Sequence, residues 1–366
     1  MTQIEALLRF LGEAVTPFHA VAAMSRRLRD AGFEQVERFD PAATTAGRGY
    51  FMSRQGSSLI AVRAGQGRPE AGLRLVGAHT DSPNLSVKPN PVKGRDGCVQ
   101  LGVDVYGSAL LNPWFDRDLA IAGRVTLLTT SGELCSTLFD SARPVAVVPS
   151  LAIHLDRDAN KQRTINPQKD VVPLVMLGDP QQFDFKAWLA ETLSAQDSQW
   201  QDARVMDYEL SLYDIQAPAV AGMNESWVTS ARLDNLLSCF AGLSALIDAD
   251  DAEWSMLVAT DHEEVGSAST VGAQGPMLMD ALTALVPEPQ DNQQLRTDSW
   301  MLSVDNAHAV HPNYADKHDD QHSPRLGGGP VIKINRNQRY ATDSESAARP
   351  RLLAERAEVD VQAFVM

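Results

Sequence analysis

The segment Leu73–Pro83 reads LRLVGAHTDSP, a short apolar run that passes directly into His79, Thr80 and Asp81. A run of this length, bounded by polar and turn-forming residues, is typical of a buried β-strand. The polar residues therefore follow the carboxyl end of the predicted strand.

Two later segments repeat this pattern. The apolar run Trp254–Thr260 ends in Asp261-His262-Glu263-Glu264, and the run Trp300–Val304 ends in Asp305-Asn306-Ala307-His308. Ligand sites of open α/β sheets gather beyond the carboxyl ends of the strands. The repetition therefore predicts one shared site formed by three strand ends.

The composition is that of a globular protein with a large core. The chain has 366 residues, of which 44% are hydrophobic, and this length allows two or three domains. No apolar stretch is long enough to span a bilayer. The formal charge of −15 would repel phosphate backbones, so we expect no nucleic-acid partner. It would also repel acidic peptides, so such a substrate would need cations in its pocket.

The predicted location is the cytoplasm. The N-terminus has neither a basic stretch nor the short apolar run of a secretory signal. The three cysteines, Cys98, Cys135 and Cys239, are widely spaced and form no CxxC pair, which is typical of a reducing compartment.

The predicted fold class is α/β, with a central sheet flanked by helices and an inserted β-rich domain. Residues 1–84 and 223–366 are assigned to the sheet domain, where Thr16-Pro17 predicts a capped helix start and Asp234 lies in the first turn of a helix. Residues 85–222 are assigned to the insertion, which carries three β-like runs: Ile121–Leu128, Val145–Leu151 and Val171–Met176.

The polar residues at the strand ends have the chemistry of a zinc site. Zinc binds imidazole and carboxylate groups, and a shared carboxylate can hold two ions about 3.5–4 Å apart. Asp81 can accept the second imidazole N–H of His79 and fix its tautomer. Glu263 can serve as the general base. The candidate ligands are His79, Asp234, Glu264 and Asp305.

Taken one at a time, these residues have commoner structural roles. An isolated HxD pair is a weak motif, and a Glu-Glu pair after a strand is usually a solvated loop. Asp234 alone would be expected to stabilise a helix N-terminus, and Asp305 alone to cap a turn.

The segments together resemble the aspartyl aminopeptidase family, a group of dizinc peptidases. The resemblance covers nearly the whole chain in order. It is carried by TPFH 16–19, GAHTDSP 77–83, PWFDRD 113–118, ARLDN 231–235, DHEEVGS 261–267, DNAHAVHPNY 305–314, GPVIK 329–333 and RYAT 339–342.

The resemblance implies a role for each metal-site residue. Asp234 would bridge two zinc ions, His79 and Asp305 would complete one ion's site, and Glu264 would bind the other ion. Glu263 would be the catalytic base.

The resemblance also implies a substrate pocket and an assembly. Lys333 would meet the acidic side chain of the substrate, with Tyr340 and Arg339 nearby. His308 and His154 would stabilise the oxyanion, His154 from a neighbouring subunit. The insertion would build dimers that assemble into a dodecamer.

At its C-terminus the sequence departs from the family's pattern. Family members continue past Met366 through a segment that carries the last metal-ligand histidine, and the run Val361–Met366 resembles a strand cut short. The expectation is that the site of His79, Asp234 and Asp305 binds zinc tightly and the Glu264 site weakly. Two alternatives to an acidic-residue aminopeptidase remain: a zinc exopeptidase for neutral N-termini, and a catalytically silent oligomeric scaffold.

Overall fold

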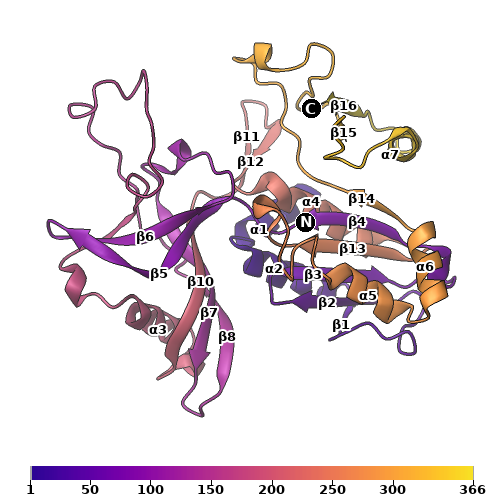
Figure 1. The fold of residues 1–366 in the computed structure, drawn as a ribbon, viewed down its shortest axis with the longest axis horizontal. Helices are drawn as coiled ribbons and strands as arrows, with labels where there is room; N and C mark the ends of the chain where they lie inside the picture. The colour runs from indigo at the N-terminus through magenta and orange to yellow at the C-terminus, as the bar shows by residue number, and fades with distance from the viewer. Residues whose placement is uncertain (1, 366) are drawn as a thin grey trace. The chain divides into compact units, whose positions relative to one another are not determined.

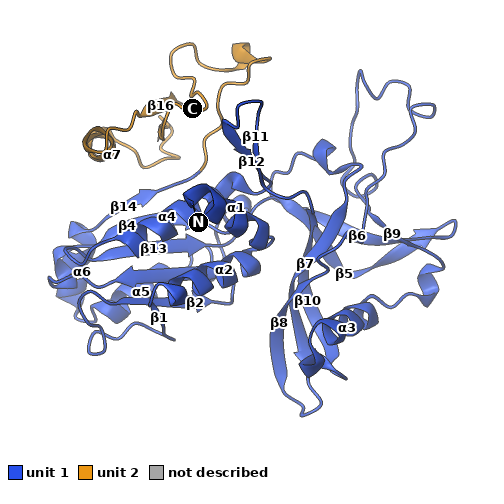
Figure 2. Ribbon diagram, turned by 180° about the vertical axis from the view of Figure 1, so that it is seen from behind, with its two compact units in different colours: residues 1–305 blue, residues 306–366 orange. Residues whose placement is uncertain are grey.

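The computed structural model describes residues 2–365, which divide into two compact units after Asp305 (Figure 2). The first unit contains two large sheets (Figure 1). One has the strand order β1-β2-β3-β13-β4-β14 and is called the central sheet below. Its strands are β1 (Glu34–Gln35), β2 (Gly49–Arg54), β3 (Ser58–Arg63), β4 (Arg74–His79), β13 (Ser255–Thr260) and β14 (Trp300–Ser303).

The central sheet is buried on both faces. Phe51, Leu59 and Leu257 pack in one core with α1, α2 and α4, whereas Ile60 and Val258 pack in another with α5 and α6. Successive side chains of a strand point to opposite faces, so a strand covered on both sides is a continuous apolar run. The predicted α/β class is confirmed. The helices are α1 (Gln3–Glu13), α2 (Pro17–Asp30), α4 (Leu233–Asp248), α5 (Met277–Leu285) and α6 (Pro289–Asp298).

The predicted start of the second helix is confirmed. The side chain of Thr16 accepts a hydrogen bond from the backbone N–H of His19, and Pro17 occupies the first helical position. A proline is tolerated there because its missing N–H would have no partner within the helix.

The second sheet has the order β8-β7-β10-β5-β6-β9 and is called the insertion sheet. Helix α3 (Phe185–Gln196) contributes Phe185, Leu189 and Leu193 to its core. The chain leaves the central sheet after β4 and rejoins it at β13, as expected for an insertion. The limits 85–222 stay a prediction. The strands are β5 (Asn84–Arg95), β6 (Cys98–Tyr106), β7 (Leu119–Leu128), β8 (Leu134–Asp140), β9 (Leu174–Leu177) and β10 (Arg204–Asp214).

One predicted strand of the insertion is wrong, and another is shifted. The run Val145–Leu151 forms only isolated bridges, at Ala146, Val147 and Val148. Pro149 follows directly, and a proline has no N–H to continue a ladder. The run Val171–Met176 becomes β9 only from Leu174, directly after Pro173.

Shorter elements complete the chain. A small hairpin joins β11 (Ala219–Ala221) to β12 (Trp227–Thr229). In the second unit, β15 (Val331–Ile334) pairs in parallel with β16 (Gln362–Val365), and α7 (Ser344–Arg356) lies between them in the sequence. The predicted strand at the end of the sequence is thus present as β16.

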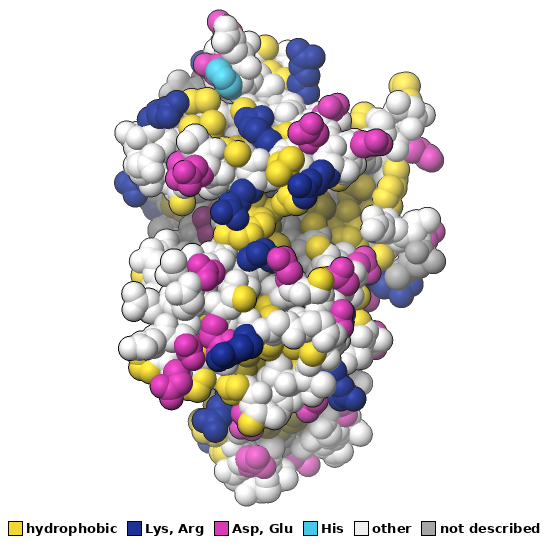
Figure 3. Space-filling view, turned by 90° about the vertical axis from the view of Figure 1, so that its right-hand side faces the viewer, with side chains coloured by type: hydrophobic (Ala, Val, Ile, Leu, Met, Phe, Trp, Pro, Cys, Tyr) yellow, Lys and Arg dark blue, Asp and Glu magenta, His cyan; other side chains and the backbone are white. Residues whose placement is uncertain are grey.

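Two features concern possible partners: the charged side chains on one face, and the length and apolar character of the helices. On the face drawn in Figure 3, Lys and Arg side chains are interspersed with Asp and Glu, so that face has no continuous basic strip. Within residues 2–365, no helix combines the length and the apolar character needed to cross a membrane.

Candidate metal centre

The three strands whose ends were predicted to meet are neighbours in the central sheet. Strand β4 pairs in parallel with β13 on one side and with β14 on the other. The register places His79 opposite Thr260, and Ser303 opposite Gly77. The polar residues that follow all three strands therefore meet at one edge, as the sequence predicted.

His79, Asp234 and Asp305 form a compact group of possible metal ligands. One ligand atom from each lies within 4.8 Å of the others. The Nε2 atom of His79 is 3.4 Å from an Asp234 carboxylate oxygen and 3.7 Å from one of Asp305. An imidazole nitrogen and two carboxylate oxygens are a donor set that suits zinc. The residues therefore fit this ion.

The electrostatic surroundings of His79 favour a positive charge. Burial acts to lower its pKa, but hydrogen bonds to Asp234, Asp305 and Asp81 outweigh burial and raise the pKa to about 12. A proton or a metal ion on Nε2 satisfies the same carboxylates. The three side chains are therefore a possible site for a cation.

Asp81 fixes the orientation of the His79 ring. Its carboxylate is fully buried, and its Oδ1 atom lies 3.2 Å from His79 Nδ1. With the proton on Nδ1, His79 donates to Asp81 and leaves Nε2 free for a metal. Burial acts to raise the pKa of Asp81, but hydrogen bonds from His79 and Tyr106 outweigh it and lower the pKa. Asp81 is therefore an ionised acceptor.

The two adjacent glutamates lie on a short 3₁₀ turn after β13. The backbone N–H groups of Glu263 and Glu264 both donate to the Asp81 carboxylate, each over 3.1 Å. The Glu263 carboxylate lies 3.8 Å from His79 Nε2 and is half exposed. Neither glutamate belongs to the compact three-residue group described above. The strand has ended here, so adjacent side chains need not point to opposite faces.

Burial raises the pKa of both glutamates. The pKa of Glu264 rises to about 7, first by burial and then by repulsion from Asp234. The pKa of Glu263 rises through burial and through the carboxylates of Asp305, Asp81 and Asp234, against an opposing effect of His79. A divalent cation among these groups would reverse the repulsion. Raised pKa values of this kind are typical of functional carboxylates.

Helix α4 is hydrogen-bonded to the ends of two of the three strands, β4 and β14. The Asn235 side chain donates to the carbonyl of Val304 over 2.9 Å, directly before Asp305. The Cys239 thiol donates to the carbonyl of His79 over 3.0 Å, and Ser82 donates to the carbonyl of Asp234. Sequence reasoning missed these bonds, although Asn235 adjoins a predicted ligand.

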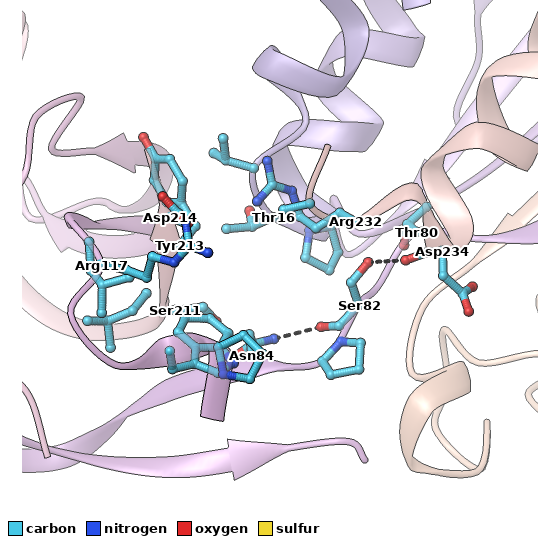
Figure 4. A pocket seen from close by; sticks show the side chains of 18 residues that line it. Thr16, Thr80, Ser82, Asn84, Arg117, Ser211, Tyr213, Asp214, Arg232 and Asp234 are labelled. Carbon is cyan, nitrogen blue, oxygen red and sulfur yellow. Dashed lines mark hydrogen bonds and ion pairs between the residues drawn. The ribbon is translucent and has the colours of Figure 1, made fainter. Parts of the chain in front are cut away.

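A cavity of about 330 Å³ lies between the two sheets of the first unit, beside the metal group. Ser82, Asn84, Tyr213 and Arg232 line it, and Asp234 borders it with its carboxylate pointing away (Figure 4). Neither His79 nor Asp305 lines this cavity. Of the three possible ligands, Asp234 is therefore the one that adjoins this cavity.

The remaining predicted site residues belong to the insertion and to the second unit. His154 is exposed on a loop of the insertion. His308, Lys333, Arg339 and Tyr340 belong to the second unit. There the His308 ring packs edge-on against Phe364, with 5.0 Å between ring centres, and Lys333 Nζ lies 5.7 Å from the centre of the Tyr340 ring. Their proposed roles stay predictions.

A metal group with a glutamate beside it is the arrangement of metal-dependent hydrolases. Comparison with known sequences shows which hydrolase family this is. Residues 10–366 match the aminopeptidase I zinc metalloprotease family (M18). The chain belongs to this family of zinc aminopeptidases.

Individual relatives agree with this assignment. A probable M18 family aminopeptidase 2 of Ectopseudomonas mendocina is 53% identical over 366 residues, which cover 99% of this chain and 85% of the relative. Among solved structures, the complex of Ape4 and Nbr1 matches with a TM-score of 0.93 at 32% identity, over 100% of this chain and 74% of that one. The mApe1 dodecamer of S. cerevisiae matches with a TM-score of 0.83 at 26% identity, over 99% of this chain and 84% of that one.

Proposed function

We propose that this zinc aminopeptidase releases Asp and Glu from the N-termini of peptides. The observation that carries the proposal is a lysine that contacts the segment directly after Asp305 in the sequence. Lys333 Nζ donates a 2.7 Å hydrogen bond to the carbonyl of Asn306, the residue that follows Asp305. An ammonium group can bind a substrate carboxylate through a charge-assisted hydrogen bond.

We further propose that the complete site holds two zinc ions, with Asp234 shared and Glu264 on the second. The surroundings of Asp234 support this role, because its side chain contacts His79 and is still about half exposed. The repulsion between the Asp234 and Glu264 carboxylates also supports a shared ion, because a divalent cation among these groups would reverse that repulsion. When bound, zinc lowers the pKa of water and polarises a peptide carbonyl.

The residues of the chain supply the remaining steps. Glu263 accepts a proton from the attacking water at a carboxylate oxygen and returns it to the leaving amine. Asp81 holds His79 in the required tautomer. His308, together with His154 of a neighbouring subunit, donates hydrogen bonds to the developing oxyanion.

Replacing Lys333 with alanine tests the acidic preference. A charge-assisted hydrogen bond contributes about 1.5–3 kcal/mol, so kcat/KM for Asp and Glu peptides should fall by about 10- to 100-fold. The value for a matched Leu peptide should stay within about twofold, because that side chain makes no such bond. Kinetics on the three peptides measures the change.

Lys317→Ala is the matched control, because it removes an exposed lysine from the same compact unit. An unchanged Asp-to-Leu ratio in Lys333→Ala would contradict the proposed pocket. It would favour an aminopeptidase for neutral N-termini instead.

We propose that the chain works as a homo-oligomer, as dimers that assemble into a dodecamer. Three large apolar side chains around His154 are exposed, namely Leu151 by 59%, Ile153 by 49% and Leu155 by 76%. Such a group usually marks a contact with another protein. Light scattering should give the mass of a dodecamer, and a monomeric mass at working concentrations would contradict the assembly.

A further inference from the structure

Tyr106 is the last residue of β6 and belongs to the insertion sheet, yet its side chain reaches the metal centre. Its hydroxyl donates a 2.7 Å hydrogen bond to Oδ2 of Asp81. Asp81 lies at the end of a different sheet, and it holds the metal ligand His79 through its other oxygen. The two sheets are therefore joined at the residue that orients this ligand.

The Asp81 carboxylate has four donors, two on each oxygen. Oδ1 receives His79 Nδ1 and the N–H of Glu263, while Oδ2 receives the Tyr106 hydroxyl and the N–H of Glu264. Three of these donors belong to residues of the metal site itself. Only Tyr106 comes from the insertion sheet.

The residue after Tyr106 also approaches the site closely. Gly107 has a positive φ of 70°, and a Cβ atom placed on it would lie 3.0 Å from the Cβ of Glu264. Glycine avoids both the strain of this backbone conformation and the close contact. The end of β6 thus packs against Glu264 as well as hydrogen-bonding to Asp81.

We propose that Tyr106 is a positioning residue of the metal centre, through which the insertion sheet sets the affinity of the zinc site. Without the hydroxyl, Oδ2 of Asp81 keeps one donor instead of two, and the fully buried carboxylate can turn away from His79. The ring of His79 then loses its alignment with Asp234 and Asp305. This inference rests on the zinc site, and it is independent of the preference for acidic residues.

The test compares Tyr106→Phe with Tyr213→Phe. Each substitution removes one hydroxyl from a half-buried tyrosine that donates to an aspartate, over 2.7 Å to Asp81 and over 2.8 Å to Asp140. Mutating a residue whose hydrogen bonds hold a metal ligand in place typically lowers metal affinity by about 10- to 100-fold. Competition with a chromophoric chelator should show a rise of this size in the zinc Kd for Tyr106→Phe. For Tyr213→Phe the Kd should change by less than about twofold.

Denaturant unfolding of the chelated proteins separates positioning from general stability. Both variants lose one partly buried hydrogen bond, so their unfolding midpoints should shift by similar amounts. In Tyr106→Phe, kcat/KM for Asp and Leu peptides at limiting zinc should fall by the same factor, since the substrate pocket is unchanged. A zinc Kd within about twofold of wild type in Tyr106→Phe would overturn the proposal. An equal rise in Tyr213→Phe would overturn it too.

A double-mutant cycle shows whether Tyr106 acts through Asp81. In an Asp81→Asn background, Tyr106→Phe should change the zinc Kd by less than about twofold, because its partner is already altered. A full, additive effect in that background would mean that Tyr106 affects the metal by another route, and it would contradict the proposed positioning.

Discussion

Replacing Glu263 with glutamine is expected to lower kcat by about 100- to 10,000-fold, the range that a general base contributes. The amide has nearly the shape of the carboxylate but cannot take a proton from water. Glu263 lies 3.8 Å from His79 Nε2 and is not part of the three-residue ligand group. Zinc content should therefore be unchanged, and steady-state kinetics with metal analysis measures both quantities.

Stability gives a second readout for this variant. The pKa of Glu263 is raised by burial and by neighbouring carboxylates. An acid whose pKa is raised in the folded state destabilises that state once pH exceeds its unfolded pKa. Without zinc at neutral pH, Glu263→Gln should therefore unfold at an equal or higher denaturant concentration than wild type. The control is Glu133→Gln, which makes the same charge change on an exposed turn. A kcat within about tenfold of wild type would remove Glu263 from the role of base.

Replacing Asp234 with asparagine is expected to raise the zinc Kd by about 100-fold or more. Mutating partners that only support metal ligands already costs about 10- to 100-fold, and Asp234 is assigned as a ligand itself. A neutral amide is also a poorer partner for a cation than a carboxylate. Chelator competition measures the Kd, and activity should fall in parallel when zinc is limiting.

Asp248→Asn is the matched control for this substitution. Asp248 is exposed at the other end of the same helix, α4, and its replacement changes the net charge by the same amount. Its zinc Kd should match the wild type. Equal zinc binding in Asp234→Asn and Asp248→Asn would show that the three-residue group is not the zinc site.

The sequence was sufficient to predict that the three possible metal ligands lie together, because each of them adjoins a strong local signal. His79 ends one apolar strand, Asp305 follows another, and Asp234 lies in the first turn of an amphipathic helix. Parallel neighbours place such ends together, which the pairing of β4 with β13 and β14 confirms.

The supporting contacts could not be predicted in the same way. Tyr106 lies 25 residues from Asp81 along the chain and in another sheet. An alternating strand pattern shows which residues face a core, but it does not show what the end of the strand meets. The bond from Cys239 to the His79 carbonyl likewise depends on how α4 packs against the sheet. The predicted strand over Val145–Leu151 was wrong because the apolar content of the run was given more weight than its prolines, Pro144 directly before it and Pro149 within it.

The most direct test of the proposed function is hydrolysis of matched short peptides with N-terminal Asp, Glu or Leu by the 366-residue chain. Each peptide is assayed with zinc supplied and again after removal of zinc by a chelator. We predict release of Asp and Glu in preference to Leu, loss of release on chelation, and recovery when zinc is restored. Preferential release of Leu, or no zinc-dependent release from any peptide, would contradict an acidic-residue aminopeptidase, and the second result would favour a silent scaffold.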